Sequence, residues 1–218
     1  MIEKDALLGD YVLRHRSMAE VALEYGCSLH KVKYWMDKYK IPTRSISEAV
    51  YIKNNPKGDP FNFKIPENNE YSFLLGLGLG LYWGEGTKAD KNTVRIGNSD
   101  PYLILKFMEF LEKLFSLNRS DFKFSLQIFG DINEDEALDF WVKKLKIEKK
   151  QFYKTTLTDK VAKGTYRKRC DYGVLIVYYH NKKLRELFGK LLADVAQLAE
   201  HDHGKIGVTG SNPVVGSK

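Results

Sequence analysis

The chain has 218 residues, two cysteines and a formal net charge of +7 at neutral pH. This length suits one substantial domain plus a small one, and the positive balance favours a polyanionic partner, with nucleic acid first. Cys27 and Cys170 form no CxxC or paired-histidine pattern, so we expect a reducing compartment, no structural zinc and no small-molecule cofactor. With no signal peptide and no apolar stretch of about 20 residues, the expected location is cytoplasmic, without a membrane partner.

Three helices are predicted at the start of the chain, the first over 4–15. Ser17 and Glu20 form a capping box that begins the second helix, which ends at Gly26, a residue type preferred in left-handed turns. Ser28 caps the third helix, which runs to about residue 39. The residues predicted to face inward are Ala6, Leu7, Tyr11, Val12, Val21, Ala22, Val32 and Trp35.

A helix, a tight turn at glycine and a second helix resemble a helix-turn-helix DNA-binding domain, here over residues 1–52. The resemblance implies that the helix over 28–39 recognises DNA, its lysines contacting phosphate while His30 and Tyr34 reach base edges. The alternative is a small helical bundle with a solvated basic face. The implied DNA contacts are His30, Lys31, Lys33, Tyr34, Lys38 and, beyond the helix, Arg44.

Residues 53–70 are predicted to link two domains, because they hold Pro56, Pro60 and Pro66 and few apolar side chains. A capping box at Ser45 and Glu48 predicts a short helix just before this linker. The run over 41–61 either tracks a DNA backbone or is a plain connection.

The longest apolar run, residues 73–88, reads FLLGLGLGLYWGEGTK. Each glycine inside a helix costs about 1 kcal/mol relative to alanine. Yet Gly76, Gly80 and Gly84 are spaced four apart, so on a helix they form one bare strip, called the glycine stripe below, where another backbone can come close. Glu85 follows at the helix C-terminal end, where the dipole disfavours a negative charge, so a cation or a function is expected there.

Residues 80–86, GLYWGEG, resemble the second half of the LAGLIDADG motif of homing endonucleases and their relatives. In that family two such helices pack side by side, and their terminal acids hold divalent metal over the scissile phosphates. The resemblance implies a homodimer through the glycine stripe, since one copy of the motif is present, and a catalytic Glu85 that ligates Mg²⁺. Trp83 departs from the usual aspartate, and glycines replace the usual alanines. The alternative is a buried packing helix that Glu85 merely ends.

The pattern downstream predicts strands over 91–97, 122–129, 152–158 and 172–180, the last of them more fully buried. It also predicts helices over 101–116, 134–145 and 182–192, the last capped by Asn181. Alternation directs Val94, Ile96, Phe122 and Phe124 inward. The order resembles the αββαββα LAGLIDADG domain over residues 71–192, with an added helix near 134–145. The expected fold class is therefore α+β, with an antiparallel sheet whose polar face forms a saddle over double-stranded DNA.

Further site residues are predicted on that saddle and beside it. Arg95 and Lys123 are expected to contact DNA, with Ser125 as a further candidate, and Lys88, Gln127 or Lys154 to polarise water or phosphate. The run over 160–169 has five basic residues and no acid, which predicts a phosphate-gripping loop or a solvated charged loop. Its DNA-contact candidates are Lys163, Arg167, Lys168 and Arg169.

The tail over 193–218 has a different character. Codons for residues 210–213 can contain the T-arm sequence of a transfer RNA, and codons for 195–200 its D-arm. We interpret this tail as an open reading frame that runs into a transfer RNA gene, disordered apart from a possible helical extension.

Two functional hypotheses remain open from the sequence. The first is a homodimeric, magnesium-dependent DNA endonuclease, and the second is a LAGLIDADG-fold transcription regulator without nuclease activity. A scaffold that does not bind nucleic acid would require both resemblances and the basic loop to be coincidental.

Overall fold

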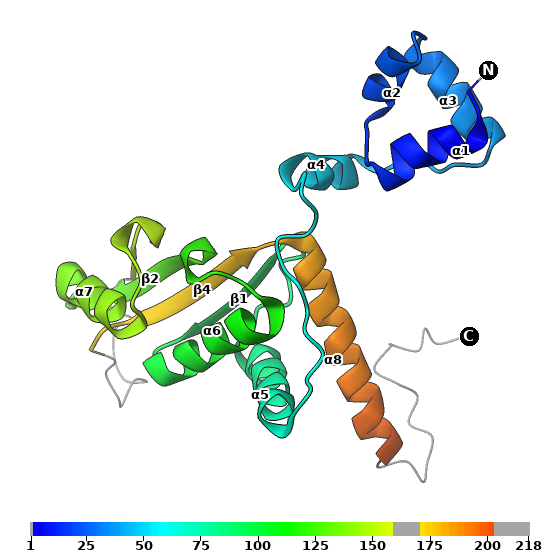
Figure 1. Ribbon diagram of the computed structural model, residues 1–218. Helices are drawn as coiled ribbons and strands as arrows, with labels where there is room; N and C mark the ends of the chain where they lie inside the picture. Colours follow the sequence, from blue (N-terminus) through cyan, green and yellow to red (C-terminus); the bar gives the residue numbers. More distant parts are fainter. Residues whose placement is uncertain (1, 159–170, 203–218) are drawn as a thin grey trace, which may run out of the picture. The chain divides into compact units, whose positions relative to one another are not determined.

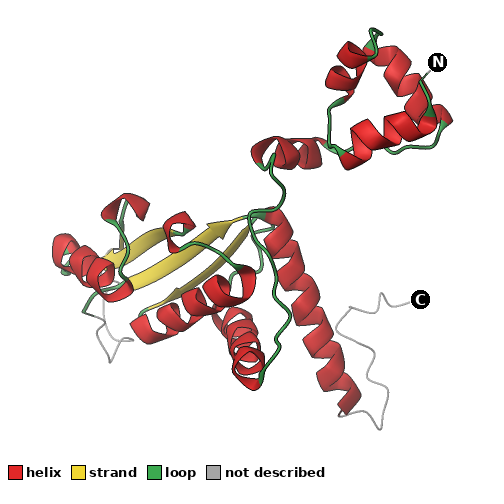
Figure 2. Ribbon diagram, in the orientation of Figure 1, coloured by secondary structure: helices red, strands yellow, loops and turns green. Residues whose placement is uncertain are grey.

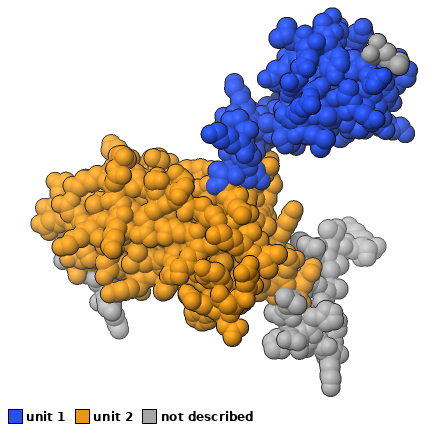
Figure 3. All heavy atoms as spheres, in the orientation of Figure 1, with its two compact units in different colours: residues 1–60 blue, residues 61–218 orange. Residues whose placement is uncertain are grey.

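A computed structural model describes residues 2–158 and 171–202 (Figure 1). The chain divides into two compact units, unit 1 over residues 1–60 and unit 2 over residues 61–218 (Figure 3). Helices build unit 1, whereas unit 2 combines helices with a four-stranded sheet (Figure 2). The expected α+β class is confirmed. None of the described helices combines the length and the apolar character needed to cross a bilayer.

Unit 1 packs three helical segments around Leu7, Tyr11, Val21, Val32 and Met36. Serine caps start two of its helices, because Ser17 accepts from the Glu20 N–H and Ser28 from the Lys31 N–H. A further helix, α4, has no buried residue. The helices are α1 (Lys4–Leu7), η1 (Leu8–Leu13), α2 (Met18–Glu24), α3 (Leu29–Lys38) and α4 (Ile46–Asn54).

The prediction that Val12 faces inward is wrong, since 42% of this residue is exposed. Residues 8–13 form a π-helix, whose wider turn shifts the side-chain register relative to an α-helix. Asp10 and Tyr11 are buried as a result. The Asp10 carboxylate accepts hydrogen bonds from Arg14 and Tyr25, so the polar group is satisfied inside the unit.

Unit 2 begins with the glycine-rich helix and alternates helices with strands. Asn68 caps the first helix and Asn181 the last, in each case through the side-chain oxygen. The last helix extends beyond the predicted end at 192 to Asp202. The elements are α5 (Asn69–Glu85), β1 (Thr93–Asn98), α6 (Pro101–Phe115), η2 (Arg119–Asp121), β2 (Lys123–Phe129), α7 (Glu134–Leu145), η3 (Lys149–Gln151), β3 (Thr156–Thr158), β4 (Val174–His180) and α8 (Lys182–Asp202).

The sheet has the order β1-β4-β2-β3 and is mixed, which corrects the expected antiparallel sheet. Strand β4 pairs antiparallel with β1 and β2, whereas β3 pairs parallel with β2. Helix α7 lies between β2 and β3 in the chain, and such a crossover is what parallel neighbours require. Between α5 and α6 there is one strand plus an isolated bridge from Gly86 to Ile96. The αββαββα order is therefore not matched strand for strand.

One face of the sheet forms the core of unit 2 with its helices. Alternate residues of β1, β2 and β4 are buried there, including Val94, Ile96, Phe124, Leu126 and Val177. Strand β4 was expected to be more fully buried than the other strands, but it alternates as they do, and its remaining residues are half-buried or exposed. The residues that alternate with these buried ones point to the second face of the sheet, called the open face below. It carries Arg95, Lys123, Ser125, Gln127, Ile176, Tyr178 and His180.

Helix α5 buries one side and exposes the other. Its buried residues are Leu74, Gly78, Leu79 and Tyr82. The glycine stripe lies on the exposed side, and a Cβ added at any of its three positions would meet nothing within 4 Å. Among the described residues the stripe therefore contacts no neighbour, and the close helix contact is made by Gly78, where an added Cβ would lie 2.1 Å from the Phe110 ring.

Candidate nucleic-acid interface

Glu85 ends α5 as an exposed carboxylate that forms no ion pair with any described residue. The Gly86 N–H donates to the Tyr82 carbonyl and closes the helix. Lys88 donates from Nζ to the Trp83 carbonyl, so its charge lies at the negative end of the helix dipole. The Gly86–Ile96 bridge places Glu85 beside the Gly97 end of β1. Glu85 and Lys88 thus lie at the outer edge of the sheet.

The donors at this point fit a magnesium ion in part. A carboxylate and the free carbonyls at a helix end are hard oxygen ligands of the type magnesium prefers. Within residues 2–158 and 171–202, no three acids, histidines or cysteines lie close enough together to hold a metal ion. Among the described residues, one chain therefore offers Glu85 as a single carboxylate at this point.

The other two catalytic candidates lie elsewhere. Gln127 is on β2, two strands away from β1, so at about 5 Å per strand it lies on the order of 10 Å from the β1 edge. Its amide donates to the Thr158 hydroxyl at 3.1 Å, which ties β2 to β3. Lys154 is exposed between η3 and β3. The structure therefore brings Lys88, and not Gln127 or Lys154, to the neighbourhood of Glu85.

A row of side chains crosses the open face from β1 through β4 to β2. Arg95 pairs with Tyr178 in register, and Tyr178 pairs with Lys123 on its other side. The Arg95 guanidinium carbon lies 5.9 Å from the centroid of the Tyr178 ring. Arg95 Nε is buried and, within the described residues, has no hydrogen-bond partner. Neither Arg95 nor Lys123 forms an ion pair with a described acid, so both cations remain available to an anionic ligand.

An aromatic cluster that the sequence did not reveal adjoins this row. The centroids of the Tyr153 and Tyr178 rings lie 5.8 Å apart, and the His180 ring lies 5.8 Å from Tyr178 and 6.2 Å from Tyr153. The Tyr153 hydroxyl and His180 Nε2 are 2.8 Å apart. Tyr153 comes from the loop after η3, and Tyr178 and His180 come from β4. The one available signal in the sequence was that Tyr178 and His180 are two residues apart, so that on a strand they point to the same face of the sheet.

Hydrogen bonds continue from this cluster to the first residue of β1, Thr93. His180 Nδ1 and the Thr93 hydroxyl are 3.1 Å apart. The Asn92 N–H, followed by the Thr93 hydroxyl, holds the pKa of Asp90 below its usual value. Thr93 and Tyr153 thus engage the two ring nitrogens of His180, one on each side of the ring. The network fixes the orientation of the His180 ring.

In unit 1 the predicted recognition helix α3 presents most of its polar residues to solvent. Lys33 is half-buried and pairs with Asp37 at 2.7 Å, one helical turn away. The Lys38 ammonium lies 4.8 Å from the centroid of the Trp35 ring. The exposed residues on α3 that were predicted to contact DNA are His30, Lys31, Tyr34 and Lys38.

Arg44 has a structural role within unit 1. Its guanidinium donates to the carbonyls of Tyr11, His15 and Arg16, and lies 4.0 Å from the centroid of the Tyr11 ring. These contacts occupy the donors that a phosphate would need. We therefore leave Arg44 out of the DNA contacts proposed below.

Two further regions bear on the interface. The candidates Lys163, Arg167, Lys168 and Arg169 lie outside the described residues, as does the tail over 203–218.

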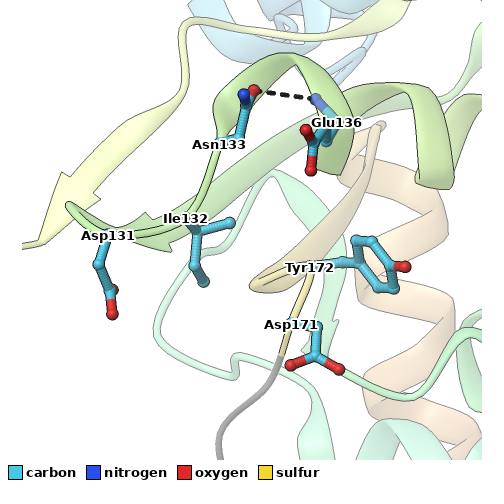
Figure 4. A pocket seen from close by; sticks show the side chains of 6 residues that line it. All are labelled: Asp131, Ile132, Asn133, Glu136, Asp171 and Tyr172. Atoms are coloured by element: carbon cyan, nitrogen blue, oxygen red, sulfur yellow. Dashed lines mark hydrogen bonds between the residues drawn. The ribbon is translucent and has the colours of Figure 1, made fainter.

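At the Val174 end of β4, away from His180, a hollow of about 280 Å³ is lined by three carboxylates, together with Ile132, Asn133 and Tyr172 (Figure 4). These carboxylates, Asp131, Glu136 and Asp171, would repel phosphate, so nucleic acid is not expected to enter this hollow.

No protein-family model, curated protein or solved structure matches the chain.

Proposed function

We propose that the chain is a sequence-specific binder of double-stranded DNA that works as a homodimer, in the manner of LAGLIDADG homing endonucleases. One observation carries the proposal. The exposed side of α5 is a strip of bare backbone that ends in the exposed Glu85 carboxylate, beside a sheet whose open face bears Arg95 and Lys123, and none of these three charges forms an ion pair with a described residue.

The exposed side of α5 supports self-association. Phe73 is 71% exposed and Trp83 51% exposed, and they flank the glycine stripe. Aromatic side chains are costly to expose to water, so burying them against a second copy is favourable. The glycine stripe between them has no side chains and would let a second helix approach closely. Two copies of α5 packed through this side would bring two Glu85 carboxylates together.

Cleavage of a phosphodiester follows from that pairing as a second part of the proposal. The two Glu85 carboxylates and the carbonyls at the α5 ends would hold Mg²⁺, which supplies an activated water and charge stabilisation at the leaving oxygen. Lys88 lies within reach of the same edge and would orient a phosphate oxygen. Arg95 and Lys123 on the open face would neutralise the backbone on either side of the reacting position.

Unit 1 would add target contacts through α3. The exposed His30 and Tyr34 would reach base edges, and the exposed Lys31 and Lys38 would reach phosphates. A second candidate function, a transcription regulator without nuclease activity, is favoured by Trp83, which stands where an aspartate is usual in the motif, and by the helical unit 1. Such a regulator would bind DNA and would not require a metal ion.

A cleavage and binding assay on a supercoiled plasmid that carries the chain's own locus distinguishes the nuclease from the regulator. The nuclease proposal expects magnesium-dependent nicking by the wild type and loss of at least about 100-fold in rate for Glu85→Gln, since removing one catalytic group has effects of that size. Glu70→Gln is the matched control, because Glu70 lies in the first turn of the same helix and is also exposed. DNA binding without nicking would support the regulator, and absence of salt-sensitive binding would refute both.

A further inference from the structure

The aromatic cluster on the open face, Tyr153, Tyr178 and His180, is not explained by binding to an intact duplex. A duplex presents phosphates, sugars and base edges, which are read by hydrogen-bond donors and acceptors. The faces of its bases are stacked on one another and are closed to aromatic side chains. Three rings whose centroids lie within 6.2 Å of one another are suited to a different feature of a nucleic acid.

We propose that this cluster, together with Arg95 and Lys123, binds an unstacked nucleobase and its adjoining phosphates. This inference rests on nucleic-acid binding by unit 2, as proposed above, and it names a second class of ligand for the same sheet. The ligand chemistry is an unpaired nucleotide, from single-stranded DNA, from RNA or from a distorted position within a duplex.

Exposure and geometry support a stacking site. Tyr153 is 46% exposed and His180 is exposed at the end of β4. Base–aromatic stacking is sequence-tolerant, and each stacked base contributes a sizeable part of the affinity of such sites. Guanidinium planes also stack on bases, and the Arg95 guanidinium lies over the Tyr178 ring with its Nε lacking a described partner.

The hydrogen-bond network prepares the rings for binding. The Tyr153 hydroxyl and the Thr93 hydroxyl each lie within hydrogen-bond distance of one nitrogen of the His180 ring. Rings that are already fixed lose less conformational freedom when a ligand binds. The network links the start of β1, the end of β4 and the loop after η3, which are far apart in the sequence.

Charge completes the site. Lys123 lies directly opposite Tyr178 on β2 and Arg95 directly opposite it on β1, so a cation flanks the rings on each side. The phosphates on either side of an unpaired base would meet these two cations. The sheet therefore offers stacking surface in the middle and phosphate contacts at both sides.

Fluorescence anisotropy with the full-length protein tests this site on four labelled probes of one sequence. The probes are a perfect duplex, the same duplex with a two-nucleotide bulge, single-stranded DNA and single-stranded RNA. We expect the bulged duplex or a single strand to bind at least about 5-fold more tightly than the perfect duplex. A 2-aminopurine at the unpaired position should be quenched when it stacks on the cluster.

Variants separate stacking from the hydrogen-bond network and from the fold. Tyr153→Ala should weaken binding of the unpaired probes about 5- to 100-fold and leave the perfect duplex within about 2-fold. Tyr153→Phe keeps the ring and should retain most of the affinity. Tyr102→Ala is the matched control, because Tyr102 is likewise an exposed tyrosine, at 66%, but lies on α6, away from the open face.

The outcomes distinguish this inference from the proposed function. Tight binding of the perfect duplex without preference for unpaired bases would refute the stacking site alone. Binding of single strands without binding of any duplex would refute duplex recognition and support the stacking site. An equal loss on all four probes for Tyr153→Ala would refute the stacking site, as would unchanged 2-aminopurine fluorescence.

Discussion

Replacing Gly78 by alanine tests the packing of α5 most sharply. The added Cβ would lie 2.1 Å from Phe110 Cγ, whereas ordinary contacts begin at 3.4 Å, so the ring or the helix must shift by about 1.3 Å. Phe110 is fully buried, and forcing extra volume into a packed core costs about 1–3 kcal/mol. Alanine recovers up to about 1 kcal/mol of helix propensity. We expect a net loss of about 1–2 kcal/mol.

Urea unfolding of the full chain, followed by the fluorescence of buried Trp141, measures this change in unit 2. Gly76→Ala is the matched control, since its Cβ would meet nothing within 4 Å. At low protein concentration, where self-association contributes little, it should stabilise unit 2 by about 0.5–1 kcal/mol. Equal unfolding midpoints for the two variants would refute the packing described here.

Two further predictions concern ion pairs. The hydrogen bond from Arg14 holds the pKa of buried Asp10 below its ordinary value, so its contribution to stability is present above about pH 4 and is lost as the pH falls through the lowered pKa. Asp10→Asn should make the stability of unit 1 depend less on pH in the acid range. An acid-unfolding midpoint, followed by Trp35 fluorescence, that is the same in the variant and the wild type would refute this role of Asp10. Arg119 contacts Glu112 through two nitrogens and the Leu145 carbonyl through a third, so Arg119→Met should cost about 1–2 kcal/mol in thermal unfolding. Arg119→Lys should recover less than half of that loss, and full recovery would argue against the forked contact.

Elements with local signals could be predicted from the sequence. The caps at Ser17, Ser28 and Asn181 each satisfy backbone groups within three residues, so residue type and spacing suffice to find them. The alternation in β2 likewise places Phe124 and Leu126 in the core as expected. A helix over the glycine-rich run follows from the spacing of its glycines.

Features that depend on distant residues could not be predicted. The role of Gly78 follows from the position of Phe110, which no pattern within α5 contains. The parallel pairing of β3 depends on where α7 returns the chain, and the π-helix that turns Val12 outward has no clear signal in a sequence. The aromatic cluster gathers residues 153, 178 and 180 only once the sheet is formed.

The stoichiometry of the complex on DNA tests the central proposal most directly. Sedimentation velocity of the wild type with a labelled duplex from its own locus should give two chains per duplex. Gly80→Leu adds a side chain where nothing lies within 4 Å in one chain, so the fold should persist while the α5 contact between copies is blocked. The account predicts loss of the two-chain complex for this variant. A two-chain complex that survives Gly80→Leu, or a wild type that binds as one chain, would contradict it.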